Sequence, residues 1–148
     1  MARIVRAGKL TLAALVATLS LFLDEATAVQ EVPTLRMLGR SVREIAEQAV
    51  RIADQLVERE VLARVTVGKG YSQMGSGSLP TQNLPTRVVA IVPKHESVST
   101  LARQLRSGRP GIFTRVKRRR LLVDPRTLLD GEEAALVDGL AEALTAKE

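Results

Sequence analysis

The sequence contains no cysteine and a single histidine, His95. Without thiols, the chain can form no disulfide, no thiolate nucleophile and no cysteine-ligated zinc site, and one histidine leaves few ways to build a histidine metal site. Aromatic residues are almost as scarce, since Tyr71, Phe22 and Phe113 are present without any tryptophan. The platforms on which unpaired bases stack are therefore missing, which argues against sequence-tolerant binding of single-stranded nucleic acid.

The sequence is instead rich in aliphatic and charged residues. Of its 148 residues, 45% are hydrophobic and 26% are charged, which is typical of a compact globular domain and not of a disordered or fibrous protein. The core has to be built from leucine, valine, isoleucine and alanine. The formal net charge of +6 favours an anionic partner, such as a tRNA or a phosphorylated small molecule.

The first 30 residues have the form of a secretory signal. Arg3, Arg6 and Lys9 make a basic start, residues 10–23 carry no charge, and Ala26-Thr27-Ala28 is typical of a cleavage site. The uncharged stretch is shorter than the roughly 20 apolar residues that a membrane-spanning helix needs. A transmembrane helix is therefore not expected.

The same segment also fits a buried helix. Large apolar residues recur in it at steps of three and four, which places them on one helical face: Leu12, Leu15, Val16, Leu19 and Phe22 or Leu23. Composition alone leaves the signal peptide and the buried helix as nearly equal alternatives. A connection that contains Pro33 is expected to follow.

The next helix is the most secure element. Ser41 and Glu44 have the spacing of a capping box, and the apolar residues that follow, up to Leu56, have a helical period. Two strands, a short helix ended by Gly108, a hairpin and a last helix capped by Asp130 are predicted after it. The predicted strands span residues 63–67, 87–92, 111–116 and 120–123. This order indicates an α+β domain, in which a small mixed or antiparallel sheet is covered on one side by helices.

Four segments carry a resemblance to a known family and occur in that family's order. They are RIVRAGKLTLAAL at 3–15, PTLRML at 33–38, GSGSLP at 75–80 and LLVDPRTL at 121–128. Together they resemble the carboxy-terminal third of bacterial selenocysteine synthase, the L-seryl-tRNA(Sec) selenium transferase. The resemblance continues through the amino-terminal segment and so favours the buried helix over the signal peptide.

The resemblance implies a fold, an activity and partners. It implies that residues 1–30 form a linking helix and that residues 31–148 form the small C-terminal α+β domain of a fold-type I pyridoxal-phosphate transferase. Members of the family are cytoplasmic homo-oligomers that convert seryl-tRNA(Sec) to selenocysteinyl-tRNA(Sec) with selenophosphate. The lysine that binds pyridoxal phosphate belongs to the large domain and is absent from this chain. We therefore expect the chain to be inactive alone and to act with a missing large domain or a separate chain.

Three arginines are implied as substrate-binding residues. Arg3 and Arg6 match family arginines that face the active site, and guanidinium groups suit an oxyanion such as selenophosphate because they bind its oxygens in pairs. Arg115 matches a strand arginine of the small domain, where a phosphate or the acceptor end of the tRNA is the expected ligand. Structural pairing of Arg115 with Asp124 or Asp130 is an equal alternative.

A basic turn is a further candidate for tRNA contact. Lys117, Arg118 and Arg119 join the two strands of the predicted hairpin, and clusters of this kind supply phosphate contacts. A solvated turn is the more ordinary interpretation. The nearby loop at 75–80 lacks the spacing of a phosphate-binding loop and is interpreted as a packing turn.

Two functions of other classes remain open at this point. One is a free-standing basic module that binds tRNA or another anion through the arginines at the amino terminus and the basic hairpin. The other is a small exported structural protein released after Ala28.

Overall fold

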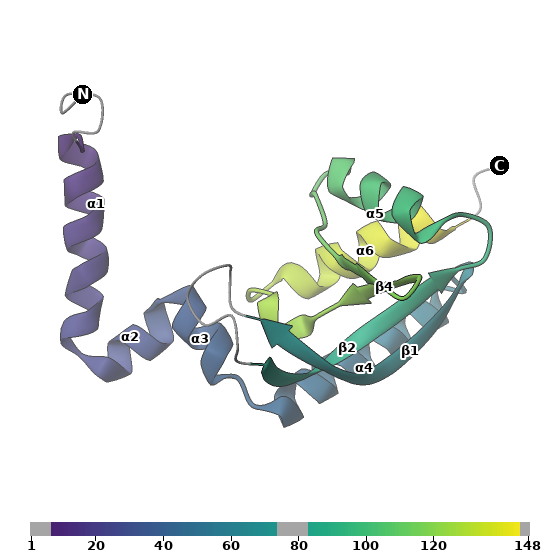
Figure 1. Cartoon of the computed structure of the whole chain (residues 1–148), viewed down its shortest axis with the longest axis horizontal. Coiled ribbons are helices and arrows are strands. Elements are labelled where there is room, and N and C mark those ends of the chain that lie inside the picture. The colour runs from purple at the N-terminus through teal and green to yellow at the C-terminus, as the bar shows by residue number, and fades with distance from the viewer. Residues whose placement is uncertain (1–6, 74–82, 146–148) are drawn as a thin grey trace. The chain divides into compact units, whose positions relative to one another are not determined.

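The computed structural model describes residues 7–73 and 83–145. The chain divides into two compact units, with the division between Gly39 and Arg40. An α+β fold is confirmed, since the described residues form six α-helices, two short 3-10 helices and four strands (Figure 1). Within those ranges no helix combines the length and the apolar character needed to cross a membrane.

The first unit consists of short helices. They are α1 (Lys9–Ser20), the 3-10 helix η1 (Leu21–Leu23), α2 (Glu25–Glu31) and α3 (Pro33–Gly39). Asp24 caps α2, because its carboxylate accepts a hydrogen bond from the Thr27 N–H at 2.8 Å. Pro33 is the first residue of α3, a position that proline favours because no backbone N–H is needed there. The predicted connection around Pro33 is therefore wrong, and the segment is helical.

Helix α1 confirms a helix in the amino-terminal segment but not its burial. No residue of α1 is buried, and its large apolar side chains are exposed. No other element within residues 7–39 covers these side chains, so the burial of this helix stays a prediction.

The second unit is built on a four-stranded sheet. Its strands are β1 (Ala63–Gln73), β2 (Asn83–Pro93), β3 (Arg115–Lys117) and β4 (Arg120–Val123), in the spatial order β1-β2-β4-β3. All neighbouring strands are antiparallel, and β1 and β2 pair along their whole length from Ala63 opposite Pro93 to Gln73 opposite Asn83. The strand predicted at 111–116 is partly wrong. The Ile112 N–H donates to the Leu105 carbonyl at 2.8 Å, so this segment bonds to the end of a helix instead of to a strand.

Three helices pack on one face of this sheet. They are α4 (Val42–Glu58), α5 (Val98–Ser107) and α6 (Glu132–Leu144), and the 3-10 helix η2 (Pro125–Thr127) joins β4 to α6. The core joins alternate residues of the strands, such as Val89 and Ile91 in β2 and Leu121 and Val123 in β4, to the apolar faces of all three helices. Helices on one side of the sheet are therefore confirmed.

The helix ends test the capping predictions. The capping box of α4 is confirmed, since the Glu44 N–H donates to Ser41 Oγ at 3.2 Å and the Ser41 N–H donates to the Glu44 carboxylate at 3.0 Å. Gly108 ends α5 as predicted. Asp130 does not cap α6, because Gly131 occupies the N-cap position with a φ of 86°, a left-handed conformation that glycine adopts without strain.

Candidate functional site

A polar cluster lies where β4 ends and η2 begins. The Asp124 side chain is only 8% exposed, and its carboxylate accepts hydrogen bonds from Ser72 Oγ at 2.7 Å and from Thr86 Oγ1 at 2.9 Å. The Arg126 N–H adds a bond to the same carboxylate at 3.3 Å. Residues from β1, β2 and η2 are thus joined through one buried anion, which is stable only because its oxygens are occupied by donors.

Arg126 is the buried cation of this cluster. It is 5% exposed, and its guanidinium donates to Ser72 Oγ at 3.2 Å, to the Pro85 carbonyl at 2.8 Å and to the Arg40 carbonyl at 3.1 Å. Burial lowers the pKa of Arg126, and the positive charge of the nearby Arg40 lowers it further. The negative charge of Asp124 acts in the opposite direction and raises the pKa. These contacts make Arg126 a structural residue that holds the end of the sheet to the start of α4.

The same network continues between α4 and α6. Arg40 donates to the Pro125 carbonyl and to the side-chain oxygen of Gln48. Gln48 in turn donates to the Glu133 carboxylate at 2.9 Å, and Gln55 donates to its other oxygen at 3.2 Å. Sequence reasoning missed this network. Its one local signal is the run Asp124-Pro125-Arg126, and the partners are distant in sequence.

Arg115 belongs to the edge of this cluster. Its guanidinium donates to the Tyr71 carbonyl at 2.9 Å and forms an ion pair with Asp124 at 3.1 Å. Of the two structural partners considered from the sequence, Asp124 is the one that the structure shows. The Arg115 side chain is 46% exposed. These bonds use two of its five N–H donors, which leaves donors for an anion. The anion-binding role of Arg115 stays a prediction.

Arg118 and Arg119 form a tight two-residue turn between β3 and β4. Their φ angles are 50° and 58°, both in the left-handed region. This geometry matches a type I′ hairpin turn, which asparagine and glycine favour. A left-handed conformation costs a side-chain-bearing residue about 1–2 kcal/mol. The turn therefore presents two arginines where smaller residues would be more stable.

The charge of the turn continues onto one face of the sheet. Leu121 lies in the core, so its neighbour Arg120 points to the opposite face. Lys117 pairs with Arg120 in register and shares that face, as does Arg115 two residues away. All residues from Arg115 to Arg120 are exposed, and within the described ranges no carboxylate pairs with those from Lys117 onward. Strand alternation, applied to the sequence, could have placed Arg120 in this basic patch.

Other predicted residues lie outside the described ranges. Arg3, Arg6 and the loop at 75–80 are among them, so the structure does not place these arginines beside Arg115 or the basic turn.

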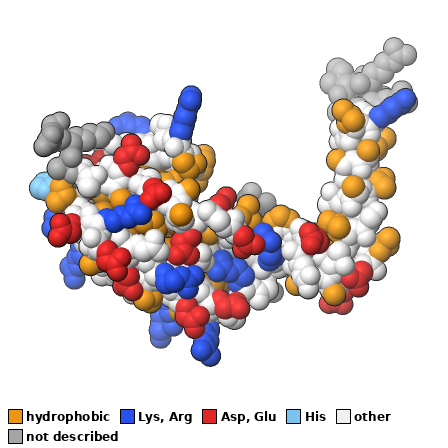
Figure 2. Space-filling view, turned by 180° about the vertical axis from the view of Figure 1, so that it is seen from behind, with side chains coloured by type: hydrophobic (Ala, Val, Ile, Leu, Met, Phe, Trp, Pro, Cys, Tyr) orange, Lys and Arg blue, Asp and Glu red, His pale blue; other side chains and the backbone are white. Residues whose placement is uncertain are grey.

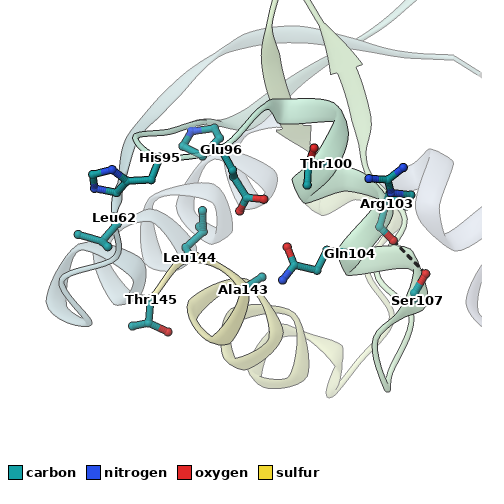
Figure 3. A pocket seen from close by; sticks show the side chains of 11 residues that line it. Leu62, His95, Glu96, Thr100, Arg103, Gln104, Ser107, Ala143, Leu144 and Thr145 are labelled. Atoms are coloured by element: carbon teal, nitrogen blue, oxygen red, sulfur yellow. Dashed lines mark hydrogen bonds between the residues drawn. The ribbon is translucent and has the colours of Figure 1, made fainter. Parts of the chain in front are cut away.

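An open groove of about 770 Å³ lies between α5 and the end of α6 (Figure 3). His95 and Glu96 line one end, and Arg103 and Gln104 of α5 line its wall. Ser107, at the other end, donates to the Arg103 carbonyl at 3.1 Å and so has no general base. The lining residues form no nucleophile-and-base pair, and the described part of the chain contains no cluster of acidic or histidine ligands that could hold a metal ion.

The described lysines do not fit a pyridoxal-phosphate site. A Schiff-base lysine has to lie in a pocket that shields the cofactor from water. The lysines placed by the structure are all exposed and line neither the groove beside α5 nor a second groove of about 370 Å³ beside the start of α6. These residues are Lys9, Lys69, Lys94 and Lys117.

Comparison with known proteins shows the family. A family model described as L-seryl-tRNA selenium transferase matches residues 1–129. The L-seryl-tRNA(Sec) selenium transferase of Alkaliphilus oremlandii is 38% identical over 142 residues, which are 96% of this chain and 30% of that relative. The relative from Nitratidesulfovibrio vulgaris is 41% identical over 145 residues, again 96% of this chain and 30% of the relative. The one from Desulfomicrobium baculatum is 40% identical over 147 residues, 98% of this chain and 31% of the relative.

The matches have two consequences. The chain spans about 30% of the length of the curated relatives that it matches. The family match runs through both compact units, from the amino-terminal helices to η2. The chain belongs to the L-seryl-tRNA selenium transferase family.

Proposed function

We propose that the chain is the carboxy-terminal part of an L-seryl-tRNA(Sec) selenium transferase, the enzyme that converts seryl-tRNA(Sec) to selenocysteinyl-tRNA(Sec) with selenophosphate. The observation that carries this proposal is the match of nearly the whole chain to less than a third of each relative. The α+β architecture supports its assignment as the small domain of a fold-type I enzyme. The family match also includes residues 1–28, which supports a structural segment over a cleaved export signal and so favours a cytoplasmic protein.

The chemistry is divided between this chain and a larger portion. Pyridoxal phosphate, when bound by a lysine of the larger portion, supplies carbanion stabilisation. Arg3 and Arg6 are proposed to bind the oxyanion of selenophosphate, and Arg115 to bind a phosphate or the tRNA end with the donors that Asp124 leaves available. The chain alone is expected to be inactive.

This division is tested by reconstitution. The 148-residue chain is co-expressed with the portion of the Nitratidesulfovibrio vulgaris relative that lies outside the matched region. Transfer of radiolabelled selenium to seryl-tRNA(Sec) is then measured for the complex and for each part. We expect activity in the complex only. Selenium transfer by the chain unaided would overturn the division, and an intact complex without transfer would overturn the proposed function.

The basic turn is proposed as a tRNA contact. In the left-handed conformation two arginines are less stable than asparagine and glycine, so stability does not account for them, whereas their charge suits a phosphate contact. The neighbouring Lys117 and Arg120 extend the charge along the sheet face, and phosphate contacts require this kind of exposed, unpaired cation. A longer basic surface also makes contact with several phosphates of one tRNA possible.

Charge removal at the turn tests this contact. The variant Arg118→Asn/Arg119→Gly removes two charges and leaves the favoured turn sequence, while Arg103→Gln/Arg106→Gln removes two charges from α5. We expect the turn variant to bind tRNA about 10-fold more weakly at low salt, with a salt dependence less steep by about two units. The α5 variant should bind within about two-fold of the unchanged chain. Equal affinities and slopes for all three proteins, or equal losses in both variants, would overturn the contact.

A further inference from the structure

Helix α1 and η1 carry an apolar stripe that nothing within residues 7–39 covers. Its members follow the i, i+3, i+4, i+7 spacing of one helical face and continue into η1: Leu12, Leu15, Val16, Leu19, Phe22 and Leu23. Each is at least half exposed, and Leu23 is 89% exposed. Figure 2 shows hydrophobic side chains along the surface of this helix. We call this set the α1 stripe.

The hydroxyl groups of the helix would keep their hydrogen bonds if the helix were buried. Thr18 Oγ1 donates to the Ala14 carbonyl and Ser20 Oγ donates to the Val16 carbonyl, each at 2.9 Å. These hydroxyls are therefore already satisfied by the helix's own backbone. Between Lys9 and Asp24 the segment carries no charge, so covering it desolvates no ion.

A helix of this length also needs a partner to persist. Isolated helices of about 12 residues are marginal in water, and in proteins an apolar face buried against another element supplies most helical stability. A face of six large apolar side chains in contact with water is a mark of an interaction site.

The composition of the helix favours a protein surface over a membrane surface as its partner. A helix that lies on a membrane surface carries lysine and arginine along its polar face. The side of α1 opposite the stripe carries alanine, threonine and the exposed Leu10, and Lys9 is the one cation of the helix. A protein surface of apolar character therefore fits α1 better than a lipid surface does.

We propose that the α1 stripe docks in an apolar groove of the larger portion of the selenium transferase. This inference rests on the proposed function. Residues 1–129 match the family, so α1 belongs to the family fold, yet more than two thirds of each relative lies outside the matched region. If the chain is the carboxy-terminal part, as proposed above, α1 is the helix of this chain that is nearest in sequence to the larger portion. The stripe is thus the surface through which this chain holds its catalytic partner.

The test uses the complex of the full chain with the larger portion, isolated through a tag on the latter. Leu15→Glu/Leu19→Glu disrupts the centre of the stripe, and Val50→Glu/Val57→Glu is the matched control because both valines are exposed on α4. We expect the stripe variant to weaken the complex about 100-fold and the control to change it less than three-fold. In hydrogen exchange, the α1 amides should exchange rapidly in the free chain and become protected in the complex.

Several results would overturn the proposal. Equal recovery of the stripe variant and the unchanged chain, or no recovery of either, would exclude docking through the stripe. A lower Tm of the free stripe variant would show that the stripe packs within the chain. Concentration-dependent dimers that the substitutions abolish would assign it to a second copy, and binding to anionic vesicles would assign it to a lipid surface. A complex that forms through the stripe but transfers no selenium would leave the docking intact and defeat the proposed function alone.

Discussion

Replacing Asp124 by alanine removes the acceptor at the centre of the polar cluster. Ser72 and Thr86 then lose the carboxylate that accepts hydrogen bonds from their hydroxyls, and the buried Arg126 loses its neighbouring anion. Hydrogen bonds to a charged group contribute about 1.5–3 kcal/mol each, and removing one partner of a buried ion pair costs about 3–5 kcal/mol. The Arg115 pair adds less than about 1 kcal/mol, because that side chain is 46% exposed. We expect a total loss of about 3–5 kcal/mol in the free energy of unfolding.

Urea unfolding measures this loss directly. Fluorescence of Tyr71 reports on the second unit, since it is the one tyrosine of a chain without tryptophan. The midpoint for Asp124→Ala should fall while the denaturant slope stays the same. Arg115→Ala is the control and should cost less than about 1 kcal/mol. A cost below about 1 kcal/mol for Asp124→Ala, or an equal cost for both variants, would refute the assignment of Asp124 as the centre of the cluster.

Three further changes test other features of the fold. Ser41→Ala should cost about 1 kcal/mol through the lost cap of α4, measured by urea unfolding at neutral pH. Hydrogen bonds from Ser41 lower the pKa of Glu44 below its ordinary 4.5, so the capping box stabilises the chain above that pH and its contribution disappears as the pH falls through the lowered value. The variant's deficit should shrink in acid, and a deficit independent of pH would contradict this account. Gly131→Ala should lower the Tm by several degrees, since φ is 86° there and a side chain is strained; an unchanged Tm would contradict it. Arg118→Asn/Arg119→Gly should raise stability by about 1–2 kcal/mol, and a loss would show that the arginines stabilise the turn.

The local elements of the fold could be predicted from the sequence because their signals are local. The capping box of α4 needs two residues three positions apart, and the short helix before Gly108 needs one turn of apolar spacing. Helix α3 was missed because Pro33 was interpreted as part of a connection, although proline is compatible with the first turn of a helix.

The length of the β1–β2 hairpin could not be predicted in the same way. Gly68 was interpreted as the end of the first strand, yet the pairing continues past it and past Gly70. A Cβ at Gly70 would lie 3.0 Å from the Val88 side chain in the neighbouring strand, so the glycine serves a close cross-strand contact. That reason becomes visible only when the strands are placed side by side.

The candidate site, too, could be predicted from the sequence only in part. The sequence identified the basic run and Arg115 as residue types, and it offered Asp124 as one of two partners. It could not show that Ser72 and Thr86, 52 and 38 positions away, complete the environment of that carboxylate. Contacts of that separation are set by the strand register, which is a property of the whole sheet.

The contacts of Arg40 anchor the beginning of the second unit. Arg126 binds its carbonyl oxygen, and its own guanidinium binds Pro125 and Gln48, so Arg40 is held at both backbone and side chain. It is the first residue of the second unit. Replacing Arg126 would therefore release the backbone of Arg40, and replacing Arg40 would release Pro125 and Gln48. A substitution that disrupts the polar cluster is thus expected to fray the first residues of the second unit together with the end of its sheet.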